Sequence, residues 1–205
     1  MIMKKTIFFY IALSTVFFVS AQGDFKKELT TARTAYAAGK LDDSRTAMQQ
    51  MLYDLDMIMG KEVLKLLPLK MQDKSAVTKL DNVASASGFI GVIIHREWGN
   101  EKTTAGTENK NINLDIISNS PLITSINALL SVPFVGNAGG NKVVKINGYK
   151  ALVSKTEGEN GNADYDLQLP LNNALITLKA PGLSQDDVIK LANALPIQDI
   201  MKMLQ

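Results

Sequence analysis

Few residues of this chain could carry out chemistry, and they are far apart. The sequence holds one histidine, His95, and no cysteine. A zinc site needs three or four ligands and thiol catalysis needs a cysteine, so neither is predicted. The sequence also lacks the G-x-S-x-G pattern that exposes a serine nucleophile on a sharp turn. We therefore predict no catalytic, metal-binding or cofactor-binding residue, and a hydrolase built around His95 is the last of three functional hypotheses.

The segment 126–142, INALLSVPFVGNAGGNK, has the composition of a phosphate-binding loop but the wrong order of elements. The pattern G-x-x-x-x-G-K-S/T leads from a strand into a helix. Here the glycines follow an expected helix and lead into an expected strand. Val143 follows Lys142, so no hydroxyl is available for magnesium. The glycines therefore indicate the end of a helix and a turn.

The segment 157–166, EGENGNADYD, spaces oxygen-bearing side chains two residues apart, as calcium loops do. An EF-hand loop also needs glycine at its sixth position and glutamate at its twelfth. Counted from Asn160, these positions hold Tyr165 and Leu171. We therefore expect a solvated hairpin loop, and no metal site enters the prediction.

Apolar side chains provide the candidate contact surfaces. Val132, Phe134 and Val135 precede the glycines, where a loop beside a sheet could present them to a partner or a lipid. The methionines of the second expected helix are expected first to pack between the two helices and the sheet domain, and their alternative role is an adaptable partner surface. The predicted contact residues are Leu130, Val132, Phe134, Val135, Met48 and Met51.

The first 21 residues have the pattern of a secretory signal peptide. Lys4 and Lys5 precede thirteen largely apolar residues, 7–19, which are too few to span a bilayer comfortably. Small residues then lead to Ala21, where we expect cleavage. With no cysteine at the cleavage site, neither lipid attachment nor a disulfide is expected. The short basic start is typical of bacteria, so the protein is expected in the periplasm or outside the cell.

The charge of the chain after cleavage argues against nucleic-acid binding. The sequence has 22 basic and 20 acidic residues, and two of the lysines lie in the first 21 residues, which leaves 20 of each sign. A neutral, mixed surface has no electrostatic footprint for nucleic acid. No later segment reaches transmembrane length, so we expect no stable membrane anchor.

Residues 22–68 have the pattern of a helical hairpin. Apolar residues recur at helical spacing up to Tyr36, Gly39 has the position of a helix C-terminal glycine, and Pro68 ends the second helix. The segment AYAAGKLDDSRTAM resembles the turn of a tetratricopeptide-type hairpin. Such repeats need about three units, and this chain shows one. The resemblance is therefore local and implies no peptide-binding groove.

Residues 69–87 are polar and weakly periodic, and we predict a linker there. From residue 88 onward, alternating apolar residues and turn signals predict the order β-β-α-β-β-β-β-α. Asn147-Gly148 predicts a tight hairpin, and Ser184 with Asp187 predicts a capped last helix. The predicted fold class is α+β: a helical hairpin, then an antiparallel sheet domain, 88–205, with its helices on one face.

The segments NGYKALVSK and DYDLQLPLNNALITLKAPGLSQDDVIKLANAL resemble, in layout, small secreted α+β domains of the PsbP/Mog1 type. The likeness covers about half of the chain and includes no diagnostic motif. Domains of this type mostly act as binding or assembly factors, so the resemblance implies a non-enzymatic role. The whole layout is also similar to that of uncharacterised secreted bacterial proteins.

These observations favour a non-catalytic exported protein that binds a protein partner in the cell envelope. The alternative is a carrier that holds a small hydrophobic ligand between the sheet and the helix 121–131. An adaptor predicts a filled core and an exposed apolar patch. A carrier predicts a dry apolar cavity. The sequence names neither the partner nor the ligand.

Overall fold

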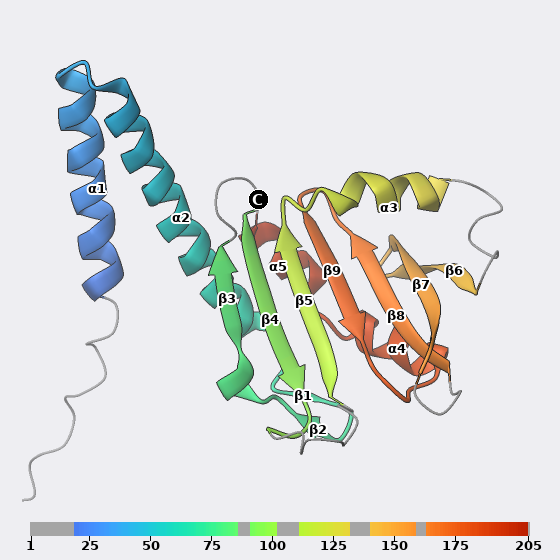
Figure 1. Cartoon of the computed structure of the whole chain (residues 1–205). Helices are drawn as coiled ribbons and strands as arrows, with labels where there is room; N and C mark the ends of the chain where they lie inside the picture. The colour runs from blue at the N-terminus through green and yellow to red at the C-terminus, as the bar shows by residue number, and fades with distance from the viewer. Residues whose placement is uncertain (1–18, 86–90, 102–110, 132–139, 159–162, 205) are drawn as a thin grey trace, which may run out of the picture. The chain divides into compact units, whose positions relative to one another are not determined.

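The computed structural model describes residues 19–85, 91–101, 111–131, 140–158 and 163–204 (Figure 1). The chain divides into two compact units, residues 1–54 and 55–205. The predicted boundary at Pro68 therefore falls inside the second unit. The reason is that two residues near the end of the second helix belong to the core of the sheet. They are Val63, in its last turn, and Leu67, directly after it.

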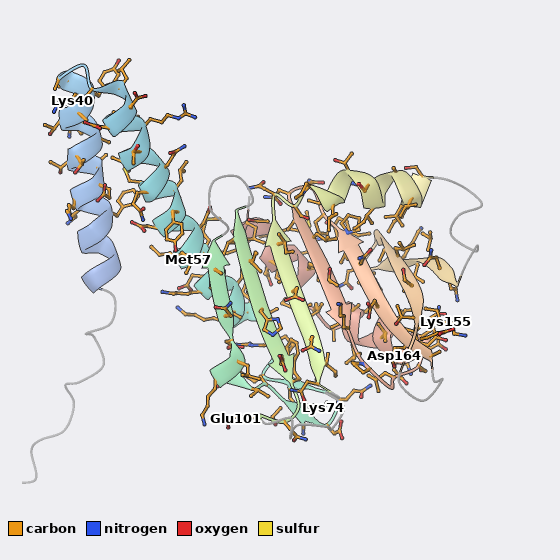
Figure 2. All side chains as sticks on the ribbon, in the orientation of Figure 1. Lys40, Met57, Lys74, Glu101, Lys155 and Asp164 are labelled. Carbon is orange, nitrogen blue, oxygen red and sulfur yellow. The ribbon has the colours of Figure 1, made fainter. Side chains whose placement is uncertain are left out.

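The predicted helical hairpin is present as α1, Val19–Ala37, and α2, Leu41–Leu66. Gly39 ends α1 with a φ of +73°, which favours glycine. The N–H of Lys40 donates to the carbonyl of Ala35 at 2.9 Å, and that of Gly39 to Tyr36 at 3.0 Å. These two bonds are a Schellman motif, so Gly39 acts as the sequence predicts. Figure 2 labels Lys40 at this turn.

The second unit is built on a seven-stranded antiparallel sheet in the order β3-β4-β5-β9-β8-β7-β6. Its described helices and strands from β4 onward follow the predicted order, which confirms the fold class. The strand bounds are β3 Asn82–Ser85, β4 Val92–Trp98, β5 Ile112–Ser118, β6 Asn141–Ile146, β7 Tyr149–Glu157, β8 Ala163–Pro170 and β9 Ala174–Lys179.

The hairpin between β6 and β7 confirms the turn prediction. Asn147 and Gly148 have φ values of +47° and +89°, as a two-residue type I′ turn requires at both positions. Their register places Ile146 opposite Tyr149. The turn thus fixes which residues of both strands share a face.

The predicted linker is wrong, because residues 69–87 contain ordered elements. They form β1, Lys70–Met71, β2, Lys74–Ser75, a 3₁₀ helix η1, Thr78–Leu80, and the edge strand β3. This segment is held by contacts far along the chain. The Trp98 indole donates to the carbonyl of Pro68 at 2.8 Å, and Arg96 binds Asp81 through two nitrogens at 2.9 and 2.5 Å.

One face of the sheet carries the main core. It packs against the end of α2, α4, Gln185–Asn193, and α5, Ile197–Met203. The predicted cap is present: the Ser184 hydroxyl accepts from the N–H of Asp187. In the described part of the chain, no helix combines the length and apolar character needed to cross a membrane. The largest fully buried side chains are Trp98, Ile94, Ile112, Leu114, Ile116, Ile146, Leu167, Leu169, Leu175, Ile176, Leu178 and Ile197.

The helices do not share one face, and this detail of the prediction is wrong. The helix α3, Leu122–Ser131, packs through Ile126 and Leu130 on Leu152 and Leu175. These two strand residues alternate with core residues of their own strands, so they point to the opposite face. Figure 1 shows α3 and the α4–α5 pair on opposite sides of the sheet. An amphipathic helix does not reveal from its own sequence which sheet face it covers.

Candidate functional site

The helical hairpin presents large apolar side chains to solvent. Their exposed fractions range from 40% to 68%, although large apolar side chains are more commonly buried. We call these five residues, all within the first unit, the hairpin apolar face. They are Leu29, Tyr36, Leu41, Met48 and Leu52.

Helix geometry places these residues on one side of the hairpin. The contact between α1 and α2 is made by the buried residues Ala32, Ala35, Ser44 and Ala47. Successive helical residues are about 100° apart, so the five residues of the hairpin apolar face flank this contact on the same side. Tyr53, 42% exposed, lies on a different side of α2. Threonines and polar residues flank it on the other side. The hairpin therefore has two different surfaces.

The second surface is a groove of about 740 Å³. Thr31 and Thr34 line it from α1, and Thr46 and Gln50 line it from α2. Two of these hydroxyls donate to their own helix: Thr31 to the carbonyl of Lys27 and Thr46 to that of Asp42, at 3.0 Å each. The groove lining includes no member of the hairpin apolar face.

The contact between the two helices explains why so much apolar surface is left over. Alanine and serine bring the helices close together but bury little side-chain area. The Ser44 hydroxyl adds one interhelical hydrogen bond, to the carbonyl of Ala32, at 3.0 Å. Two helices alone cannot enclose larger side chains, which need a third element to cover them.

The structure separates the residues predicted to contact a partner. Met48 is 48% exposed on the hairpin apolar face, and Met51 is partly buried beside the helix contact. Leu130 lies on the face of α3 that packs against the sheet, so it is buried and belongs to the core. Val132, Phe134 and Val135 lie outside the described residues. The helical part of the predicted surface is thus accessible, whereas Leu130 is not.

The carrier hypothesis places a ligand between α3 and the sheet. The contact between α3 and the sheet is made directly by four side chains, each at most 8% exposed: Ile126, Leu130, Leu152 and Leu175. Their side chains fill this contact with protein atoms. No observation on the described residues favours the carrier over the adaptor.

His95 lies in a polar cluster on the sheet face that α3 partly covers. Its Nδ1 is 2.7 Å from the Asp115 carboxylate, and its Nε2 is 3.2 Å from that of Glu97. Asp115 is directly opposite on β5, and Glu97 is two residues along β4. The second oxygen of Glu97 accepts from the amide of Asn111 at 2.7 Å. These contacts hold the imidazole between two carboxylates.

This arrangement favours the charged imidazolium. The hydrogen bond that the His95 ring donates to the Asp115 carboxylate is the main cause that raises the pKa of His95 above its usual value. Glu97 raises this pKa further, while burial opposes the change. A general base needs a ring nitrogen with a free lone pair. Both nitrogens of His95 already face carboxylates, so the cluster suits a structural ion pair better than proton abstraction. The described residues contain no group of three or more histidine or acidic side chains that could hold a metal.

The sequence identified His95 but not its partners. The signal was present in the alternation of β4, which places His95 and Glu97 on one face. Asp115 could not be assigned without the register between β4 and β5, and the end of β4 and the start of β5 show no two-residue turn that would fix it.

Comparison with known proteins identifies no relative: no family model, no curated protein and no solved structure matches this chain. The resemblance to domains of the PsbP/Mog1 type therefore stays a prediction. The functional argument depends on the chain's own surfaces.

Proposed function

We propose that this chain is a non-catalytic, exported binding protein whose hairpin apolar face docks on a helical segment of a protein partner. One observation carries the proposal. The hairpin exposes five large apolar side chains on one side while alanines and a serine form its inner contact. Exposed apolar clusters of this kind mark interaction sites in soluble proteins.

A helix fits this surface better than a flat partner does. Two antiparallel helices leave a shallow channel between their rows of side chains, and ridges of a third helix can pack into it. An amphipathic partner helix would be recognised through apolar residues at spacings of three and four. The channel would then be covered along its length.

Two arginines indicate the charge of the partner. Arg33 of α1 and Arg45 of α2 are exposed beside the hairpin apolar face, by their positions on the helical wheel. Among the described residues, neither forms an ion pair. A partner helix with acidic residues bordering its apolar row would pair with both. Such rim charges mainly increase association rate and selectivity.

The expected affinity is moderate. Covering a half-exposed large apolar side chain contributes about 1 kcal/mol, so five contribute about 5 kcal/mol and the partner's own row a similar amount. Association costs roughly 4–15 kcal/mol in lost motion. The surplus is small, so we expect a complex that exchanges rather than one that is permanent.

Site-specific photo-crosslinking in the host cell tests the proposal. A photoreactive amino acid at position 48 should give one heteromeric product of defined mass, and the same residue at position 50, in the threonine groove, should not. Leu52→Asp should abolish the product because it places a charge within the apolar contact. Thr46→Asp is the matched control on the groove side and should leave the product unchanged.

Two outcomes would overturn the proposal. Equal products from positions 48 and 50 would show that the hairpin apolar face is not selective. A product with the mass of two copies of this chain would replace the heteromeric partner with self-association.

A further inference from the structure

The strand β6 ends the seven-stranded sheet, and of the described residues only those of β7 pair with it. In its sequence, NKVVKI, both lysines are exposed, Asn141 and the two valines are partly buried, and only Ile146 is fully buried. An unpaired strand edge offers a row of backbone donors and acceptors to another chain. Figure 1 shows β6 at the end of the sheet opposite to β3.

Both edge strands have a covered face, because Ile146 of β6 lies in the main core and α2 lies against β3. Gly60 of α2 packs so closely on β3 that a Cβ at this position would lie 2.5 Å from Val83 and 2.8 Å from Val92. β3 is also shorter, with four residues against six in β6. β6 is therefore the better candidate for an added strand.

The backbone groups that β6 turns outward can be assigned. The N–H of Lys155 donates to the carbonyl of Gly140 at 3.0 Å, so this pair is hydrogen-bonded. In an antiparallel ladder, hydrogen-bonded pairs alternate with pairs whose N–H and C=O groups face away. The outward groups of β6 consequently belong to Asn141, Val143 and Lys145.

Lysines surround this edge. Lys145 on β6 is directly opposite Lys150 on β7, and both are exposed, as is Lys142. Among the described residues, no carboxylate forms an ion pair with any of the three. Like charges directly opposite each other in a sheet are destabilising. The sheet therefore keeps an unfavourable, unneutralised pair next to its open edge.

We propose that the β6 edge binds an extended peptide segment in which two apolar residues are flanked by acidic ones. The segment would add as an eighth strand, with its backbone bonded to Asn141, Val143 and Lys145. Its apolar residues would lie beside Val143 and Val144, and its acidic residues would neutralise Lys142 and Lys145. This site is independent of the hairpin apolar face.

Protection against unwanted pairing is the other role of an edge lysine. Charged residues on the edge strand itself serve that role, and Lys142 and Lys145 both lie on β6. Lys150 lies on β7, which is not an edge strand, so protection does not account for it. An acidic added strand accounts for Lys142, Lys145 and Lys150 together.

The first test uses a defined probe. The full chain is titrated with a fluorescent hexapeptide in which two valines are flanked by glutamates, and with a matched hexapeptide that has lysines instead. We expect the glutamate peptide to bind at least about tenfold more tightly at low salt, with the difference shrinking as salt screens the charges. Equal binding of the two peptides, or no binding of either, would overturn the proposal.

Hydrogen exchange locates the bound peptide. The amides of Val143 and Lys145 should exchange more slowly in its presence, whereas the amide of Val144, already bonded to β7, should not change. Protection elsewhere without protection at these two amides would place the peptide at another site and contradict the proposal.

Two variants separate backbone pairing from charge. Val143→Pro removes an outward N–H and should weaken binding about three- to tenfold, while Val143→Thr keeps it and should not. Lys145→Glu should reverse the preference so that the lysine peptide binds more tightly. If Val143→Pro unfolds the sheet, the Lys145→Glu variant still tests the proposal. A Lys145→Glu variant that still binds the glutamate peptide more tightly than the lysine peptide would refute it.

Discussion

The helical hairpin and the sheet unit solve the same packing problem with different success. The sheet is covered on both faces, and its largest side chains, Trp98 among them, are fully buried. The hairpin buries Ala32, Ala35 and Ala47 and leaves Tyr36 68% exposed. The sheet unit encloses its largest side chains, whereas the hairpin leaves the five large side chains of its apolar face at least 40% exposed.

The largest expected effect comes from truncating one aromatic side chain in each region. Trp98→Ala removes a fully buried indole and its bond to Pro68, and should lower the free energy of unfolding by about 3–5 kcal/mol. Tyr36→Ala should change it by less than about 0.5 kcal/mol. Urea unfolding of both variants measures the contrast. A similar loss for the two would mean that the hairpin has a packed core after all.

Charged side chains sharpen the comparison within the sheet unit. Arg96 is 5% exposed and pairs with Asp81, so Arg96→Ala leaves a poorly solvated carboxylate and should cost about 3 kcal/mol. Lys79→Ala removes the exposed ion pair with Glu101 and should cost below about 1 kcal/mol. Equal costs in urea unfolding would contradict the structural role given to Arg96.

Two glycines distinguish crowding from backbone conformation. Gly60→Ala places a Cβ against Val83 and Val92 and should cost about 1–3 kcal/mol. Gly39→Ala meets no neighbouring atom, but its positive φ should cost about 1 kcal/mol. Replacing Val83 by alanine should relieve Gly60→Ala and have no influence on Gly39→Ala. Additive effects at positions 60 and 83 would disprove the crowding.

The smallest expected effect is a pH dependence confined to the sheet unit. The raised pKa of His95 means that its ion pairs stabilise the fold fully below the unfolded-state pKa of about 6.5. This contribution is lost as the pH rises through the higher folded-state value. Unfolding curves from pH 5 to 9 should show it, and His95→Gln should remove it. If the free energy of unfolding rose from pH 5 to 9 and His95→Gln removed that rise, the predicted direction of the pH dependence would be wrong.

Local patterns were enough to predict most elements from the sequence. Alternation, the Asn147-Gly148 turn and the cap at Ser184 depend on neighbouring residues. The turn and the cap are confirmed, and strict alternation is seen in β4 and β5. The 69–81 segment was missed because its order depends on Arg96 and Trp98, some 15 to 30 residues away. Hydrogen bonds between residues far apart in the chain produce no repeating pattern of apolar residues, so they cannot be predicted from the spacing of residues.

The candidate surfaces were predicted less well, for a related reason. Met48 is exposed, and its place in the apolar stripe of a helix was visible in the spacing of the sequence. Leu130 was misassigned because apolar residues look the same in a buried stripe and in an exposed one. Which residues face His95, and which lysine faces Lys145, depends on how neighbouring strands are aligned. The turn at Asn147 fixes the alignment of β6 with β7, so the lysine pair could have been predicted. No such turn fixes the alignment of β4 with β5, so the partners of His95 could not.

The pairing of β5 with β9 bears on how the chain is made. The middle of the sheet joins residues 112–118 to residues 174–179, which are synthesised much later. Until β9 has emerged, β5 has only one of its two neighbouring strands, β4. A chain that is threaded through an export channel benefits from this delay, because it stays extended during transit. If this chain is exported as proposed, the central pairing of the sheet forms only after residues 174–179 have crossed.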